Sequence, residues 1–185
     1  MKIQMQEDFD VFKKLRFFMI ALLAISLAAC GEAEISKVDD GDDSTDQKEE
    51  NKSEEQNLQI GDSVNFDGLK ITLNEARIEE GGEFDEPEND QFVVVNLTVE
   101  NTTDEEQVVS SILNVELKDS ENYSYSTTIL LEGTKGQLDG SVEPGGSLRG
   151  DIPFDVPQSE EYQLHFSDPF KSGKAIWIIP SSELQ

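Results

Sequence analysis

A dense group of carboxylates carries the clearest candidate for chemistry in this chain. Seven of the twelve residues from 79 to 90 are acidic, and they are Glu79, Glu80, Glu83, Asp85, Glu86, Glu88 and Asp90. Carboxylate oxygens are hard ligands of the kind that Ca²⁺ prefers. A solvated acidic loop that keeps the protein soluble accounts for the same residues and is the simpler interpretation. Calcium is therefore the one cofactor that the sequence retains as a hypothesis.

The side chains needed for enzymatic catalysis are scarce. His165 is the only histidine and Cys30 the only cysteine. Nucleophilic catalysis by serine or cysteine needs an adjacent base, and alternation between Leu164 and Phe166 points His165 away from the core, as an ordinary surface residue. Carboxylate pairs at glycosidase spacing are expected by chance in so acidic a chain. We predict a protein that is not an enzyme and has no catalytic residues.

The net charge excludes one class of partner. The chain has 40 acidic and 14 basic residues, a formal charge of −26. Binding to nucleic acid requires clustered Lys and Arg side chains that displace counterions from phosphates, and an acidic surface repels them. We therefore predict no nucleic-acid partner.

Residues 1–29 are predicted to be a lipoprotein signal peptide. Three basic residues precede an apolar run from 17 to 27, which has the length of a signal-peptide core and is too short to span a bilayer. The sequence Leu-Ala-Ala-Cys at 27–30 then resembles the bacterial lipobox, which implies cleavage after residue 29 and lipid on Cys30. We expect a protein anchored by lipid to the extracytoplasmic face of the cell membrane.

The chain after Cys30 divides by composition. Residues 31–57 contain eleven acidic residues, three lysines and no aromatic residue. Low hydrophobicity with high charge cannot bury enough surface to offset the entropy of ordering. We therefore predict a disordered tether over residues 30–57, spanning on the order of 30 Å as a flexible coil and at most about 90 Å. The folded domain is then residues 58–185.

The folded domain alternates apolar and polar residues with the period of a β-strand. Alternating runs lie at 69–73, 91–101, 113–117, 150–156 and 162–166, and an apolar run follows at 175–179. Pro153 within one run predicts an edge strand or a bulge. About seven to nine short strands separated by polar turns indicate an all-β, immunoglobulin-like antiparallel β-sandwich.

Several of these segments resemble a known family. Residues 60–73, beginning Ile-Gly-Asp-Ser-Val, 92–101, beginning Phe-Val-Val-Val-Asn, and 142–157, beginning Val-Glu-Pro-Gly-Gly, resemble the domain-of-unknown-function 4352 family in sequence and order. The resemblance implies an immunoglobulin-like fold related to a mycobacterial secreted antigen. It also implies a Gram-positive lipoprotein or secreted protein, and it supplies no catalytic residue. Family members often carry Asp-x-x-Gly where residues 119–122 read Asp-Ser-Glu-Asn.

Two functional classes remain open. In the first, the domain is a non-enzymatic binding module, a monomer that contacts a protein or glycan of the cell envelope with its loops or a sheet edge. Phe84, Tyr123 and Tyr125 are candidate contact residues for such a partner. In the second, the domain binds a small ligand or a divalent cation and serves a transporter or sensor.

Overall fold

The computed structural model describes residues 31–38 and 57–185. The signal peptide predicted over residues 1–29, the lipidation predicted at Cys30 and most of the predicted tether, 39–56, lie outside the described residues. In the part of the chain that is described, no helix has the length and apolar character needed to cross a membrane.

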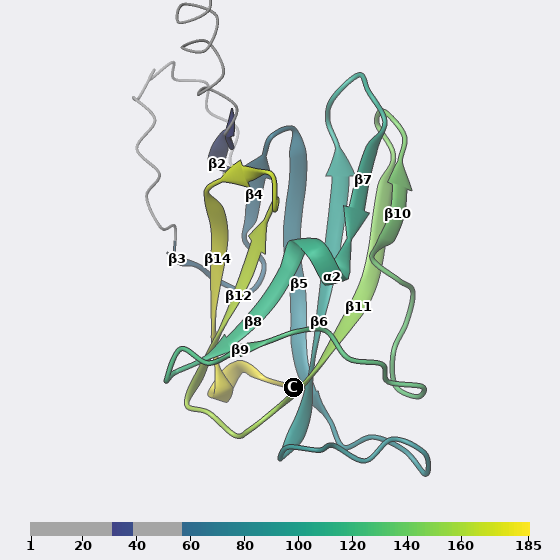
Figure 1. Ribbon diagram of the computed structural model, residues 1–185, viewed down its shortest axis with the longest axis vertical. Coiled ribbons are helices and arrows are strands. Elements are labelled where there is room, and N and C mark those ends of the chain that lie inside the picture. Colours follow the sequence, from purple (N-terminus) through teal and green to yellow (C-terminus); the bar gives the residue numbers. More distant parts are fainter. Residues whose placement is uncertain (1–30, 39–56) are drawn as a thin grey trace, which may run out of the picture. The chain divides into compact units, whose positions relative to one another are not determined.

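Two five-stranded sheets form a β-sandwich (Figure 1). The first sheet has the order β11-β6-β5-β4-β2, with strands β11 Ser147–Val156, β6 Gln91–Asn101, β5 Leu69–Glu79, β4 Ser63–Phe66 and β2 Ile35–Val38. The second has the order β3-β14-β12-β8-β9, with strands β3 Asn57–Leu58, β14 Lys174–Pro180, β12 Glu161–Ser167, β8 Val115–Asp119 and β9 Ser124–Tyr125. All neighbours are antiparallel except β14 and β3. The predicted immunoglobulin-like sandwich is confirmed.

The remaining elements are short. They are β1 Gly31–Glu32, β7 Gln107–Ser110, α2 Ser111–Asn114, β10 Asp139–Val142, β13 Lys171–Ser172 and the 3-10 helix η1 Ser181–Glu183. Strands β7 and β10 pair in a separate antiparallel sheet. Strand β11 is the edge of the first sheet, so the edge position predicted for Pro153 is confirmed.

The core lies between the two sheets and consists of the residues that alternation points inward. Ile71, Val95 and Phe154 of the first sheet share one buried cluster with Leu164 and Trp177 of the second, and each of these five side chains is fully buried. Burial of a large apolar side chain stabilises a fold by about 1.5–3 kcal/mol. The apolar residues at every second strand position therefore account for the stability of the sandwich.

A β-bulge in β5 changes which of its residues face the core. The register against β6 shifts between Leu73 and Glu75. Before the bulge the odd-numbered residues are buried, whereas after it Ala76 is buried and Arg77 lies on the outer face. A bulge places one extra residue in a strand and so reverses the alternation beyond it. Polar residues of β5 that would otherwise enter the core are thereby directed to the outer surface.

The structure differs from the predicted tether at its beginning. Strand β2 pairs antiparallel with β4, from Ile35 opposite Phe66 to Val38 opposite Ser63. The backbone N–H of Ala33 also donates to the carbonyl of Ser172 at 2.8 Å. Residues 32–38 therefore belong to the sandwich, because an edge strand gains its main-chain hydrogen bonds from a neighbour even where its own sequence is mostly polar.

The turn after β8 lacks the glycine that members of the resembled family often carry. Asn122 stands at the fourth position and has a φ of 66°. Asparagine is among the few residues other than glycine that adopt this left-handed conformation readily. Asp119 fixes the turn, since its Oδ1 accepts hydrogen bonds from the backbone N–H groups of Glu121 and Tyr123, both at 2.9 Å. Asn122 thus supplies a left-handed conformation at this turn without glycine.

Candidate functional site

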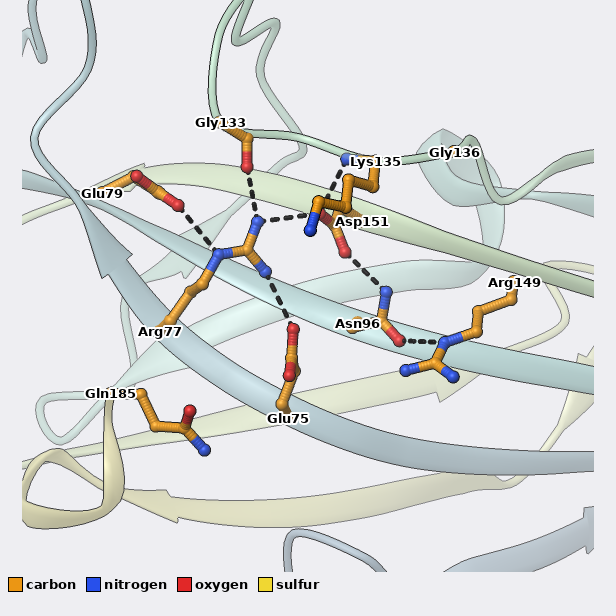
Figure 2. Close-up of a pocket in the computed structure, with 10 residues that line it drawn as sticks. All are labelled: Glu75, Arg77, Glu79, Asn96, Gly133, Lys135, Gly136, Arg149, Asp151 and Gln185. Carbon is orange, nitrogen blue, oxygen red and sulfur yellow. Dashed lines mark hydrogen bonds and ion pairs between the residues drawn. The ribbon is translucent and has the colours of Figure 1, made fainter.

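A polar pocket of about 770 Å³ lies on the outer face of the first sheet (Figure 2). Strands β5, β6 and β11 supply its floor, and the long connection between β9 and β10 supplies one wall. The lining residues are Glu75, Arg77, Glu79, Asn96, Gly133, Lys135, Gly136, Arg149, Asp151 and Gln185. We call this hollow the arginine pocket, because both arginines of the folded domain line it.

The connection from 126 to 138 covers the free edge of β11 and reaches over the outer face of the sheet. The N–H of Thr128 donates to the carbonyl of Pro153 at 2.9 Å, and the N–H of Asp151 donates to the carbonyl of Lys135 at 3.0 Å. Leu130 packs in a small buried cluster with Phe92 and Val94. An edge strand leaves main-chain groups unpaired, so these contacts both satisfy β11 and fix the wall of the pocket.

Asp151 is the buried anion of the arginine pocket, with a side chain that is 2% exposed. Its Oδ2 accepts hydrogen bonds from Arg77 Nη2 at 2.7 Å and from the N–H of Lys135 at 2.8 Å. Its Oδ1 accepts one from Asn96 Nδ2 at 2.5 Å. Burial alone would raise the pKa of this carboxyl, but the hydrogen bonds hold its pKa below the ordinary value. Asp151 is therefore ionised at neutral pH.

Arg77 is fully engaged within the protein. Its Nε donates to Glu79 at 2.8 Å, its Nη1 lies 3.3 Å from Glu75, and its Nη2 donates to the carbonyl of Gly133 at 2.6 Å as well as to Asp151. Burial lowers the pKa of this guanidinium, while the hydrogen bonds to Asp151 and Glu79 outweigh burial and raise it. Each of its three nitrogens has a partner (Figure 2), so Arg77 holds the pocket together.

Asn96 orients Arg149 by accepting a hydrogen bond from one of its three guanidinium nitrogens. Its Nε donates to Asn96 Oδ1 at 2.7 Å, and Asn74 Nδ2 donates to the same oxygen at 2.9 Å. Neither terminal nitrogen of Arg149, nor Nζ of Lys135, has a hydrogen-bond or ion-pair partner among residues 31–38 and 57–185. Figure 2 shows Arg149 on one side of Asn96 and Glu75 on the other. The pocket thus offers oriented cationic donors opposite a carboxylate.

The charge of the pocket differs from that of the domain around it. Residues 58–185 contain 26 acidic and 7 basic residues, a formal charge of −19. Three of those seven basic residues line the pocket, where they face three carboxylates. An anion approaching elsewhere meets a repelling surface, whereas here it meets a locally neutral site where the terminal nitrogens of Arg149 have no partner within the described part of the chain. Guanidinium groups bind carboxylates through paired N–H donors.

The predicted calcium ligands are spread over several roles. Glu79 binds Arg77, Asp85 accepts a hydrogen bond from the N–H of Leu131 at 2.8 Å, and Asp90 accepts one from the N–H of Gln158 at 2.9 Å. The other four, Glu80, Glu83, Glu86 and Glu88, are exposed. The described residues contain no group of three metal-ligating side chains brought together. Calcium binding at this loop stays a prediction.

His165 departs from its prediction. It lies on the outer face of the second sheet, as alternation indicates, where it lines a shallow hollow with Lys118 and Gln163. However, His165 is only 5% exposed, so the prediction of an ordinary surface histidine is wrong. Adjacent strands cover it, because it stands opposite Glu116 on one side and Ile176 on the other.

The candidate contact aromatics have different environments. Phe84 is 76% exposed and Tyr123 is 64% exposed. Tyr125 instead donates its hydroxyl hydrogen to Asp119 Oδ2 at 2.7 Å, and burial together with this hydrogen bond raises the pKa of Tyr125 to about 12. Tyr125 is therefore part of the turn after β8, while the other two side chains are available to a partner.

The domain is thus an immunoglobulin-like β-sandwich with a polar pocket on one outer face. Residues 58–176 match the family described as domain of unknown function (DUF4352), and the chain belongs to that family. The family resemblance predicted from the sequence is confirmed. A comparison with curated proteins finds no match.

Solved structures that resemble this domain have low sequence identity to it. The ycdA protein of Bacillus subtilis, described as a candidate lipoprotein, is 16% identical with a TM-score of 0.53 over 72% of this chain and 40% of its own. The yjhA protein of Bacillus subtilis is 14% identical with a TM-score of 0.51 over 69% of this chain and 99% of its own. The secreted protein MPT63 of Mycobacterium tuberculosis has a TM-score of 0.43 at 11% identity, over 64% and 83% of the two chains. This chain spans only two fifths of ycdA, and the likeness concerns the fold.

Proposed function

We propose that the protein is a lipid-anchored, non-enzymatic binding module on the extracytoplasmic face of a Gram-positive cell membrane. Its arginine pocket receives a carboxylate group of the ligand. The observation that carries the proposal is the state of Arg149, whose Nε is fixed by Asn96 while neither terminal nitrogen has a partner among the described residues. A pre-oriented guanidinium loses little conformational entropy when it binds a carboxylate.

The chemistry of the pocket favours binding over catalysis. None of the residues that line it is a serine, threonine, cysteine or histidine. The carboxylates of Glu75, Glu79 and Asp151 all contact Arg77, and the lowered pKa of Asp151 makes it a poor proton donor at neutral pH. An orienting role for the network therefore accounts for these groups better than acid–base chemistry does.

Replacement of Arg149 tests the pocket. The probes are succinate, as a free small acid, and the capped peptide acetyl-Gly-Asp-Gly-amide, whose only carboxylate is the aspartate side chain. Since a hydrogen bond to a charged group contributes about 1.5–3 kcal/mol, Arg149→Gln should weaken binding roughly tenfold or more in calorimetric titrations. The titrations are made at low ionic strength, because at about 0.1 M salt the attraction between charges is screened beyond about 10 Å.

The matched control for this titration is Lys118→Gln. It removes one cation from the outer face of the second sheet and should leave affinity unchanged. Binding of succinate would place the protein in the small-ligand class, and binding of the peptide alone would favour an envelope protein as partner. The pocket proposal fails if neither probe binds, or if the two variants lose affinity equally.

Replacement of Cys30 tests the anchor. The basic residues, the short apolar run and the Leu-Ala-Ala-Cys sequence at 27–30 support attachment of lipid at this cysteine. One acyl chain binds a membrane only marginally and two bind it stably, so the dual chain implied by the lipobox should retain the protein in the membrane fraction. Cys30→Ser should release it to the aqueous fraction, with loss of the lipid mass. A Cys30→Ser protein that stays with the membrane would contradict the proposed anchor.

A further inference from the structure

The first described residues of the chain are fastened to one end of the sandwich. The N–H of Glu34 donates to Asp67 Oδ1 at 2.7 Å, and the N–H of Asp67 donates back to the carbonyl of Glu34 at 2.9 Å. Strand β2 follows directly and pairs with β4. Because Ile35 is opposite Phe66, this strand begins at the β4–β5 turn and runs away from it.

The connection between β12 and β14 joins the same end. The N–H of Ala33 donates to the carbonyl of Ser172, and Lys171 Nζ forms an ion pair with Asp67 Oδ2 at 2.7 Å. Gly173 has a φ of 101° and its Cα hydrogen faces Ile35, where a Cβ would lie 3.0 Å from Ile35 Cδ1. Residues 33–35, the β4–β5 turn and residues 168–173 thus form one connected surface, which we call the anchor end.

Phe170 projects from the anchor end with 81% of its surface exposed. Val108, which is 70% exposed, lines a small hollow together with Asp168 and Lys171 of the same end. Isolated exposed apolar residues are common, so their exposure alone says nothing of a partner. What identifies a partner is the position of these two residues beside residues 33–35, which follow closely after Cys30 in the sequence.

We propose that the anchor end sits against the lipid headgroups, with Phe170 at the boundary between headgroups and acyl chains. The proposal rests on the lipid anchor at Cys30 described under the proposed function. Two residues, and hence three Cα–Cα steps, separate Cys30 from Ala33, a span of at most about 11 Å. The headgroup layer of one leaflet is only about 5–8 Å thick. A lipid on Cys30 therefore holds this end of the domain at the surface, and residues 39–56 form an internal connection between β2 and β3.

A long tether predicts a different geometry. If residues 31–57 were free, the domain would move within tens of ångströms of the membrane, and neither end would be preferred. The seated domain instead directs its opposite end outward. Phe84 lies in the loop between β5 and β6, and β5, with 11 residues, separates the start of that loop from the β4–β5 turn by about 35 Å. Figure 1 shows these two loops at opposite ends of the sandwich.

These two phenylalanines provide a matched pair of probes. Phe170→Trp and Phe84→Trp each introduce one exposed indole, at the anchor end and in the loop after β5 respectively. The only native tryptophan, Trp177, is fully buried and serves as the same background in both variants. The full-length lipidated chain is reconstituted in nanodiscs of phosphatidylcholine with brominated acyl chains. We expect a blue shift and loss of emission for Phe170→Trp, and emission typical of water for Phe84→Trp.

A linker insertion then separates seating from tethering. Twenty Gly and Ser residues inserted after Gly31 should abolish the quenching of Phe170→Trp, because they lengthen the chain between the lipid and the anchored strand. The same linker inserted after Asp43 should leave quenching intact, since Asp43 lies beyond β2. Equal loss of quenching with both insertions would show that residues 31–57 act as one tether, and would overturn the proposal.

The remaining outcomes distinguish this proposal from the anchor itself. A chain without lipid on Cys30 will not enter the nanodiscs, and then both proposals fail. If the lipidated chain enters but Phe170→Trp behaves as Phe84→Trp does, only the seating fails. A blue shift of Phe170→Trp in lipid-free Cys30→Ser protein that grows with protein concentration would assign Phe170 to contact between two copies, and the seating would again be wrong.

Discussion

Arg77→Leu should lower the free energy of unfolding by about 3–5 kcal/mol, because it leaves the carboxylate of Asp151 buried without its cation. The Asp151 side chain is almost inaccessible to water, and Arg77 Nη2 lies 2.7 Å from its Oδ2. The remaining donors, Asn96 and the N–H of Lys135, are neutral. Urea unfolding followed by fluorescence of the buried Trp177 measures the change.

Two companion variants give this result its meaning. Lys118→Leu breaks a more exposed contact of 3.9 Å with Glu116 and should cost no more than about 1 kcal/mol. The double variant Arg77→Leu, Asp151→Asn removes the unpaired charge and should recover much of the loss. If Arg77→Leu were no more destabilising than Lys118→Leu, the network would not contribute to stability as described.

The pH dependence provides an independent check on the same ion pair. Burial by itself would raise the pKa of Asp151, but in the native protein its hydrogen bonds, first that from Arg77, keep the pKa below its ordinary value. The stabilisation is therefore complete above the unfolded-state pKa of about 3.9 and is lost as the pH falls towards the folded pKa. In Arg77→Leu the buried carboxyl has a raised pKa, so protonation relieves its penalty. The stability difference between the two proteins should therefore begin to narrow above pH 4, as the pH falls through the raised pKa of the variant, and should narrow further below about pH 4, where the wild-type protein loses its own stabilisation.

Much of the fold follows from alternation in the sequence. The run predicted from Gln91 to Asn101 coincides with β6, and the runs at 150–156, 162–166 and 175–179 lie within β11, β12 and β14. In β6, β11 and β12 the inward-facing apolar residues recur at every second position because one face meets the core, whereas the run in β14 is apolar throughout. Their burial dominates the local energetics, so the pattern is visible without any knowledge of neighbouring strands.

Strand β2 could not be predicted in the same way. Its four residues include only Ile35 and Val38 as apolar residues, and both are only partly buried. They stand within a stretch whose composition is that of a disordered segment. What orders them is main-chain pairing with β4 and contact with Ser172 and Asp67, which are distant in sequence. Composition describes a window of the chain and carries no information about such partners.

The arginine pocket depends on long-range register. Asp151 stands opposite Asn96 and Arg77 opposite Val94, so residues from three strands meet on one face. The bulge after Leu73 is also required, since without it Arg77 would point into the core. Neither register nor bulge is encoded in a local pattern. The one available signal was Arg149, which directly precedes the run predicted at 150–156, whereas Arg77 lies four residues beyond the run predicted at 69–73.

Gly150→Ala should destabilise the domain by about 1–3 kcal/mol and abolish ligand binding, although alanine is the better strand residue. Gly150 does not have a positive φ, so its backbone conformation suits alanine. A Cβ at this position would lie 2.4 Å from the carbonyl carbon of Gln137 and 2.6 Å from the nitrogen of Leu138. Both are backbone atoms, so the connection that forms the pocket wall has to move.

That movement affects the core and the pocket together, which is why a single methyl group has so large an effect. Leu138 is almost fully buried in the main core, and Lys135 binds Asp151 just before it. Gly82→Ala is the matched control, because its Cβ would meet only the flexible end of Glu132, and it should change stability by less than about 0.5 kcal/mol. Urea unfolding and titration with the pocket probes are applied to both variants. Equal stability and equal affinity of the two would show that the connection from 126 to 138 is not held against Gly150, and that the pocket wall is set by other contacts.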